Sequence, residues 1–274
     1  MDKKAIILYF SGTGNTEYII KEYQTLMTDM DWQVDIKQFE LLEEGTSLDE
    51  YTLIGIGFPV YAWRPPGWVL RKVNALPDAR VEQKAFIIGT AGGIYCSAAM
   101  PMVNALRRKG FEVLRADFYL LYDNFFPNLM QMPVVEEFIK KRFDRAKTKV
   151  NENVQALLAG EKRIEVQGLG CMGTALSMSL GMLLERKGRF VFSNKARVSD
   201  ACIHCQLCYT TCPAGAIDWI DNKPSFNPRC IVCLRCYNVC PTRAIIRFEQ
   251  PIRIKKGFLA PGFIPPQVRP RVET

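Results

Sequence analysis

Residues 5–16 read AIILYFSGTGNT, six apolar residues that pass into a turn rich in glycine and hydroxyl groups. The apolar run predicts a strand that is buried on both faces, as in parallel sheets covered by helices. Residues 15–30, which follow the turn, have a helical composition. A buried strand that leads directly into a helix is the first step of an alternating α/β sheet, so this stretch sets the fold class.

The same alternation continues through the N-terminal half of the chain. Further strands are expected at residues 33–39, 52–58, 84–90 and 111–121, and helices at residues 67–75 and 97–109. Five strands with intervening helices predict a doubly wound parallel sheet over residues 1–130.

The pattern changes after Tyr122. We expect residues 131–195 to form a helical connector that packs on the first domain, with a long amphipathic helix at 134–158 and a short strand at 190–193. The uncharged stretch 166–184 has the length of a membrane span, but its glycines and hydroxyl residues favour a buried or interface helix. The basic, proline-rich tail, residues 251–274, is expected to be extended or flexible.

One glycine motif in the connector points to a different function. Residues 168–173 match the GxGxxG pattern of dinucleotide-binding loops. Only one βαβ unit would fit before the next motif, and a dinucleotide domain needs a sheet of several strands. A helix with a small-residue packing face is therefore favoured over an NAD(P) site.

Ten cysteines stand against a single histidine, His204. Eight of them lie between Cys202 and Cys240, whereas Cys96 and Cys171 are interpreted as small buried hydrophobic residues. One imidazole cannot build a two-histidine zinc site. Because the first residues do not resemble a secretory signal, we expect a reducing cytoplasm, in which crowded thiols are metal ligands rather than disulfides.

The eight clustered cysteines form two copies of CxxCxxCxxxCP, 28 residues apart. Three thiolates two residues apart can surround one iron–sulfur cluster, while the fourth, before proline, reaches the other cluster. A zinc ribbon would not use the third cysteine of each run. The expected ligand sets are Cys202, Cys205, Cys208 and Cys240 for the first [4Fe–4S] cluster, and Cys230, Cys233, Cys236 and Cys212 for the second.

This repeat resembles the bacterial two-cluster ferredoxins, which implies a small α+β domain over residues 196–250. The formal charge of +8 is concentrated beside it: the net charge is −3 over residues 1–130, +5 over 131–200 and +6 over 201–274. Two anionic clusters would cancel most of that excess. Nucleic acid is therefore not an expected partner.

The FSGTGNT turn lacks the Gly-Lys-Ser/Thr ending of a Walker loop and is not GxGxxG. Its hydroxyls and the N–H groups at a helix N-terminus can neutralise a phosphate without a cation. The turn resembles the phosphate loop of the flavodoxins, although a ligand-free turn stays an alternative. The candidate phosphate-binding residues are Ser11, Gly12, Thr13, Gly14, Asn15 and Thr16.

By similarity to flavodoxins, two later strand ends are the second and third flavin loops. Tyr61 or Trp63 could lie against the isoalloxazine ring or simply cover the core. FMN is preferred over FAD because nothing obvious would receive an adenosine half. The candidates in these loops are Pro59, Val60, Tyr61 and Trp63 in the second, and Thr90, Ala91, Gly92, Gly93 and Tyr95 in the third.

The order of domains resembles the flavodoxin-domain-fused ferredoxins of anaerobic microbes. This resemblance implies an electron-transfer protein that couples one-electron and two-electron partners through FMN and two [4Fe–4S] clusters. We expect another redox protein as its partner and assign no catalytic residue. The alternative is an oxidoreductase in which the flavin acts on NAD(P)H or a small substrate and the clusters relay electrons. A third possibility is a subunit that docks on a larger redox enzyme.

Overall fold

The computed structural model describes residues 3–43, 45–80, 83–124, 135–167, 179–188, 190–191, 196–246 and 258–272. Contacts along the chain divide it into two compact units. The first comprises residues 1–11, 15–122 and 136–181. The second comprises residues 12–14, 123–135 and 182–274.

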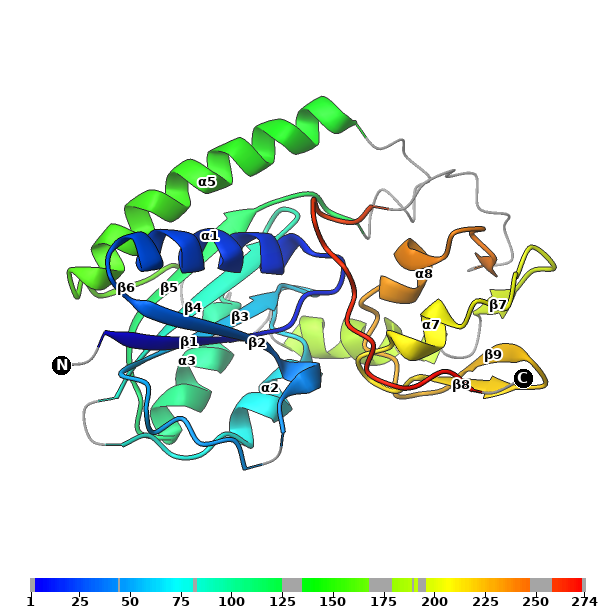
Figure 1. Cartoon of the computed structure of the whole chain (residues 1–274), viewed down its shortest axis with the longest axis horizontal. Helices are drawn as coiled ribbons and strands as arrows, with labels where there is room; N and C mark the ends of the chain where they lie inside the picture. Colours follow the sequence, from blue (N-terminus) through cyan, green and yellow to red (C-terminus); the bar gives the residue numbers. More distant parts are fainter. Residues whose placement is uncertain are drawn as a thin grey trace. The chain divides into compact units, whose positions relative to one another are not determined.

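The first unit is built on a six-stranded sheet of order β2-β1-β3-β4-β5-β6, in which all neighbours run parallel (Figure 1). The order 2-1-3-4-5 is that of flavodoxin-like doubly wound sheets, so the predicted fold class is confirmed. The strands are β1 (Lys4–Tyr9), β2 (Gln33–Gln38), β3 (Leu53–Pro59), β4 (Lys84–Ala91), β5 (Glu112–Leu120) and β6 (Arg163–Ile164).

The sixth strand corrects the prediction of five. Arg163 and Ile164 of β6 pair with Arg115 and Ala116 of β5. Two residues are too few to show the alternation by which a strand is recognised in a sequence. The formation of β6 depends on its pairing with β5 at the edge of the sheet.

Helices cover both faces of this sheet. On one face α1 (Asn15–Asp29) packs against α5 (Glu136–Leu158), and on the other α2 (Gly67–Asn74) packs against α3 (Ala99–Arg108) (Figure 1). A 3-10 turn, η1 (Phe39–Leu41), follows β2. Because both faces are covered, the central strands are apolar throughout, and side chains such as Ile7, Leu8, Ile54 and Ile87 are fully buried.

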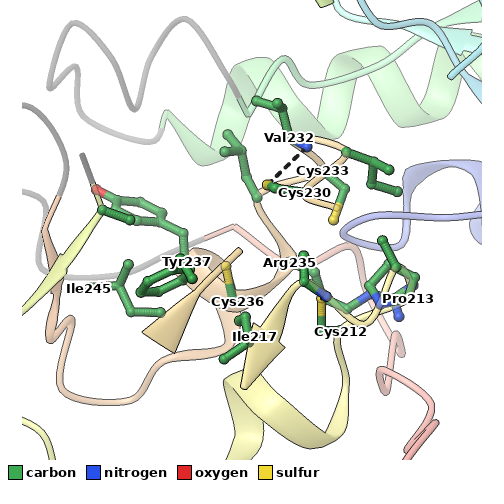
Figure 2. Close-up of a pocket in the computed structure, with 16 residues that line it drawn as sticks. Cys212, Pro213, Ile217, Cys230, Val232, Cys233, Arg235, Cys236, Tyr237 and Ile245 are labelled. Carbon is green, nitrogen blue, oxygen red and sulfur yellow. Dashed lines mark hydrogen bonds between the residues drawn. The ribbon is translucent and has the colours of Figure 1, made fainter. Parts of the chain in front are cut away.

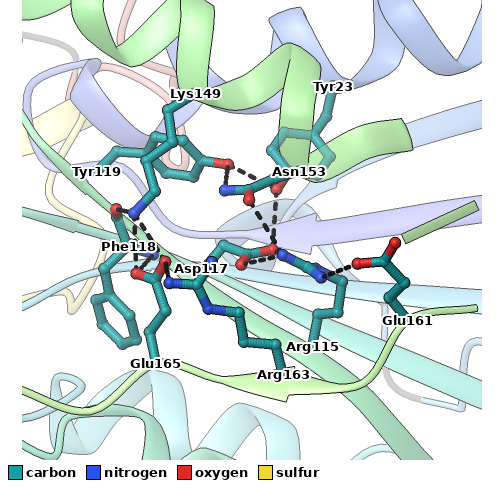
Figure 3. Close-up of polar contacts among 10 residues, drawn as sticks. All are labelled: Tyr23, Arg115, Asp117, Phe118, Tyr119, Lys149, Asn153, Glu161, Arg163 and Glu165. Carbon is teal, nitrogen blue, oxygen red and sulfur yellow. Dashed lines mark hydrogen bonds and ion pairs between the residues drawn. The ribbon is translucent and has the colours of Figure 1, made fainter. Parts of the chain in front are cut away.

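A buried polar network joins α5 to β5 (Figure 3). The guanidinium of Arg115 donates to both oxygens of Asp117, at 3.1 and 3.0 Å, and to Asn153 Oδ1 at 3.1 Å. Asn153 Nδ2 in turn donates to the hydroxyl of Tyr119 at 2.9 Å. The network satisfies polar groups that would otherwise be costly beneath the helix.

A second polar link joins α5 to the segment that follows β6 (Figure 3). Lys149 Nζ donates to Phe118 O at 2.8 Å and to Glu165 Oε2 at 2.9 Å. The same carboxylate oxygen accepts the N–H of Phe118 at 3.1 Å. The long helix is thereby an integral layer of the first unit.

The second unit contains short elements. β7 (Arg197–Val198) pairs antiparallel with β10 (Ile245–Ile246), and β8 (Ile217–Ile220) forms a hairpin with β9 (Lys223–Phe226). Two left-handed residues, Asp221 and Asn222, close the hairpin, as a two-residue type I′ turn requires. The helices of the repeat are α7 (Leu207–Thr210) and α8 (Arg235–Val239).

The described part of the C-terminal tail, residues 258–272, is extended and is anchored within the second unit. Val268 N donates to Thr210 O at 2.8 Å, and the guanidinium of Arg269 lies 4.1 Å from the ring centroid of Tyr209. Phe258 N donates to Asn238 Oδ1 at 3.0 Å. These contacts connect the tail to both α7 and α8.

Two expectations for the connector are only partly covered by the described residues. Phe190 and Val191 are helical, in place of the strand predicted at 190–193; a short apolar run does not distinguish the two structures. The GxGxxG match at 168–173, with Cys171, lies outside the described residues. Among the described residues, no helix has the length and apolarity to cross a bilayer.

Candidate functional site

The cysteines of the second unit line two cavities (Figure 2 shows the second). Each cavity takes three cysteines from one repeat and the fourth from the other. Residues of the first cavity include Cys202, Cys205, Cys208 and Cys240. Residues of the second include Cys212, Cys230, Cys233 and Cys236.

The repeat extends to the backbone conformation of the cysteine loops. Left-handed residues recur in pairs 28 positions apart, although most are not glycine. For Val232, whose φ is 56°, this conformation is strained because its side chain is branched at Cβ. The pairs are His204 and Val232, Gln206 and Leu234, and Gly215 and Arg243.

Backbone N–H groups point at the cysteine sulfurs at equivalent places in both repeats. Ala216 N lies 3.2 Å from Cys212 Sγ, and Ala244 N lies 3.3 Å from Cys240 Sγ. Such donors stabilise negative charge on sulfur and tune iron–sulfur clusters. The two cysteines that cross between the repeats therefore have the same supporting contact.

The electrostatics of the cavities favour metal-bound thiolates over free ones. Burial raises the pKa of Cys208 to about 12, and the other three thiols of its set add to the rise. Burial also raises the pKa of Cys233 to about 12, although the Arg235 guanidinium opposes the rise. Without a metal these thiols hold their protons at neutral pH, so metal binding must release them.

The donor chemistry of both cavities fits an iron–sulfur cluster. All four titratable donors in each are sulfur, and His204 is exposed, with its Nδ1 2.6 Å from Asn222 O. Within the described ranges no three His, Cys, Asp or Glu side chains converge on a point that could hold a single ion. Such convergence is not needed in a cubane, where each thiolate binds a different iron.

The three expected flavin loops follow β1, β3 and β4 at the carboxyl edge of the sheet. Thr90 connects them, because its hydroxyl lies 2.8 Å from that of Thr16 and its carbonyl accepts the N–H of Val60 at 2.7 Å. Ser11 Oγ accepts the N–H of Glu17 at 3.3 Å, at the start of α1. Asn15 Nδ2 donates to Tyr122 O at 2.8 Å.

The residues of the first loop are divided between the two units. Gly12, Thr13 and Gly14 belong to the second unit by their contacts, unlike Ser11, Asn15 and Thr16. Thr13 is buried, and Gly14 has a φ of 100°, which only glycine adopts readily.

The second loop makes a tight turn after Pro59 and Val60. Tyr61 and Arg64 exchange two backbone hydrogen bonds, at 2.9 and 3.2 Å, around the left-handed residues Ala62 and Trp63. Tyr61 and Trp63 are each half-buried. Their side chains are thus neither wholly in the core nor wholly in solvent.

Burial decreases along the third loop. Thr90 and Ala91 are buried, Gly92 is half-buried and Gly93 is exposed. Tyr95 stacks on Phe118 of β5, with the ring centroids 4.4 Å apart. One face of the Tyr95 ring is therefore already covered by the protein.

Two residues of this loop region were missed by sequence reasoning. Arg142, on α5, donates to Gly92 O at 2.6 Å and to Leu121 O at 2.5 Å. Gln167 Oε1 accepts the N–H of Tyr95 at 2.9 Å. Neither belongs to a motif, and both reach the loop from distant parts of the chain, so no local signal could have found them.

Comparison with known proteins agrees with the cysteine repeat. Residues 201–246 match the family described as 4Fe-4S dicluster domain. No curated protein matches the chain.

Among solved structures, oxidised flavodoxin 2 from Bacillus cereus is 18% identical over 57% of this chain and 98% of its own, with a TM-score of 0.42. A flavodoxin from the domain Archaea is 16% identical over 56% of this chain and 99% of its own, with a TM-score of 0.38. The rubredoxin oxygen:oxidoreductase of Desulfovibrio gigas is 13% identical over 58% of this chain, with a TM-score of 0.41, and this chain spans 37% of its length. The fold assignment itself rests on the strand order, and the chain joins a flavodoxin-like sheet to a segment that matches the 4Fe-4S dicluster family.

Proposed function

We propose that this chain is an electron-transfer protein that holds two [4Fe–4S] clusters and one FMN. The observation that carries the proposal is the crossed partition of eight cysteines between two cavities. Such clusters each exchange one electron at a time, whereas FMN exchanges one or two. The proposed ligands are the two sets of four cysteines that line these cavities.

The cysteine loops would connect the two clusters, because each repeat would supply one ligand to the cluster of the other. Cys212 and Cys240 each end one repeat and line the cavity of the other. The N–H groups of Ala216 and Ala244 would stabilise the negative charge on those two sulfurs. Crossed ligation keeps the two clusters close, which supports stepwise electron transfer between them.

The support for FMN comes from the chain's own loops. Ser11 and Thr16 place hydroxyls at the N-terminus of α1, where a phosphate is favoured by the helix dipole. Thr90, in the third loop, is linked to the first loop through its hydroxyl and to the second through its carbonyl. We propose the flavin domain over residues 1–130 and the cluster domain over residues 196–250, in a reducing cytoplasm.

The test is an anaerobic purification of the full chain in which iron, sulfide and flavin are counted together. We expect about eight irons and eight sulfides, from two four-iron clusters, with one FMN. Zinc in place of iron, or four irons in total, would contradict the proposal for the clusters. Full iron without flavin would contradict only the proposal for FMN.

A flavin-dependent oxidoreductase is the competing function. Steady oxidation of NAD(P)H by the loaded protein, without an added carrier, would favour that enzyme. We expect no such turnover until a second redox protein is supplied.

A further inference from the structure

The two cysteine repeats differ in charge at two positions next to a proposed ligand, the residue before the first cysteine (Ala201 and Arg229) and the residue before the third. The residue before the third cysteine is Leu207 in the first repeat and Arg235 in the second. Arg235 is fully buried. Among the described residues of the cysteine repeat, it is the one buried side chain that carries a full positive charge.

The fold holds the Arg235 guanidinium beside the second cavity. Arg235 lines that cavity together with Cys233 and Cys236, and Figure 2 shows its side chain near Cys212. Its Nη1 donates to Thr211 O at 2.9 Å, the carbonyl that directly precedes Cys212. This bond helps to fix the guanidinium beside the second cavity.

Other arginines near the cysteines are better screened by solvent. Arg229 precedes Cys230, but its side chain is 64% exposed and lies 3.4 Å from the carboxylate of Asp218. Arg243 lies near Cys240, a proposed ligand of the first cluster, and is only half-buried. Because a charge acts more strongly where water is excluded, Arg235 outweighs both.

We propose that Arg235 gives the second cluster the higher reduction potential, so that an electron shared by the pair resides there. The inference rests on the proposed function, since it requires two clusters. Reduction adds one negative charge to a cluster that is already anionic, and a buried cation favours that state. Leu207 offers the first cluster no such charge.

The test is an electron paramagnetic resonance titration of the anaerobic, cluster-loaded full chain. We expect the two clusters to differ at least tenfold in their oxidised-to-reduced ratio at one potential, which corresponds to 59 mV for one electron. Arg235→Met should reduce this difference between the two clusters about tenfold, because it lowers the potential of the second cluster, whereas Arg235→Lys should retain most of the difference.

Arg243→Met is the matched control, because it removes an arginine from the side of the first cluster. Its effect should be smaller than that of Arg235→Met and should fall on the first cluster. The Cys212→Ser variant assigns the signals, since it perturbs the second cluster.

The outcomes separate the two proposals. Two results would overturn the role of Arg235 and leave the two-cluster function standing. One is that both clusters have the same potential in the unmodified protein. The other is that loaded Arg235→Met keeps the full difference between the clusters in their oxidised-to-reduced ratios. If Arg235→Met fails to assemble its second cluster, the potentials of the unmodified protein and of Arg235→Lys still test the proposed role of Arg235. Fewer than two clusters in the unmodified protein would instead overturn the proposed function.

Discussion

The sheet of the first unit and the cysteine repeat of the second have backbones specified in different ways. In the first unit, β1, β3 and β4 are strands of six to eight residues with almost wholly buried side chains. In the second, the strands have two to four residues, and non-glycine residues adopt left-handed conformations around each cavity. The sheet is specified by apolar burial, whereas we expect the fold of the repeat to depend on metal binding by its cysteines.

This difference predicts the largest effect. Removing iron from the anaerobically purified chain should leave the amide hydrogens of the parallel sheet protected from exchange, while those of residues 196–246 lose protection. Hydrogen-exchange mass spectrometry measures both regions in one sample. Equal protection of the repeat with and without iron would remove the contrast between the two units.

Single cysteine replacements sharpen the comparison within the repeat. Cys212→Ser should damage mainly the second cluster and Cys240→Ser mainly the first, because each thiol lines the cavity of the other repeat. Iron content and electron paramagnetic resonance spectra distinguish the clusters. Each variant is the control for the other, and damage to the cluster nearer in sequence would contradict crossed ligation.

The buried network of the first unit tests whether apolar burial alone specifies the sheet. Asp117→Asn removes the buried carboxylate beside Arg115 and leaves only the exposed Glu161 at 3.8 Å, so the free energy of unfolding should fall by about 3 kcal/mol. Urea unfolding followed by circular dichroism measures this loss. Glu112→Gln is the matched control, because Glu112 pairs with Lys162 at the surface, and it should leave the transition unchanged.

The smallest expected effect concerns the proposed flavin loops. Thr16→Val removes the hydroxyl that lies 2.8 Å from Thr90 and should weaken FMN binding about tenfold, or about 1.4 kcal/mol. Flavin fluorescence titration of the flavin-free full chain measures the affinity. Thr25→Val, on the exposed side of the same helix, should bind FMN normally; equal weakening in both variants would point to a general change in α1.

Much of the first unit could be predicted because its strands are long and apolar. The strand predicted at residues 84–90 is β4, Lys84–Ala91, and the helix predicted at 134–158 is α5, Glu136–Leu158. The buried network could not be predicted, since Arg115 and Asn153 show no pairing signal across 38 residues. Arg142 at the third loop was missed for the same reason.

In the second unit the spacing of the cysteines was informative because ligand chemistry limits which thiols can share a cluster. Their crossed grouping is what the structure shows around the two cavities. The anchoring of the tail was not foreseen. Its proline-rich composition indicates an extended chain but does not indicate that Val268 or Arg269 will find partners on α7.

The sequence by itself determined the doubly wound parallel sheet and the positions of the main helices, and it indicated the grouping of cysteines that lines the two cavities. These properties are encoded locally, in apolar periodicity and in the spacing of ligands along the chain. Only the tertiary structure decided that β6 completes the sheet, that Arg115 lies beside Asp117 and Asn153, and that Arg235 is buried beside one cavity. Burial and long-range hydrogen bonding depend on which segments meet in space, and no short stretch of sequence carries that information.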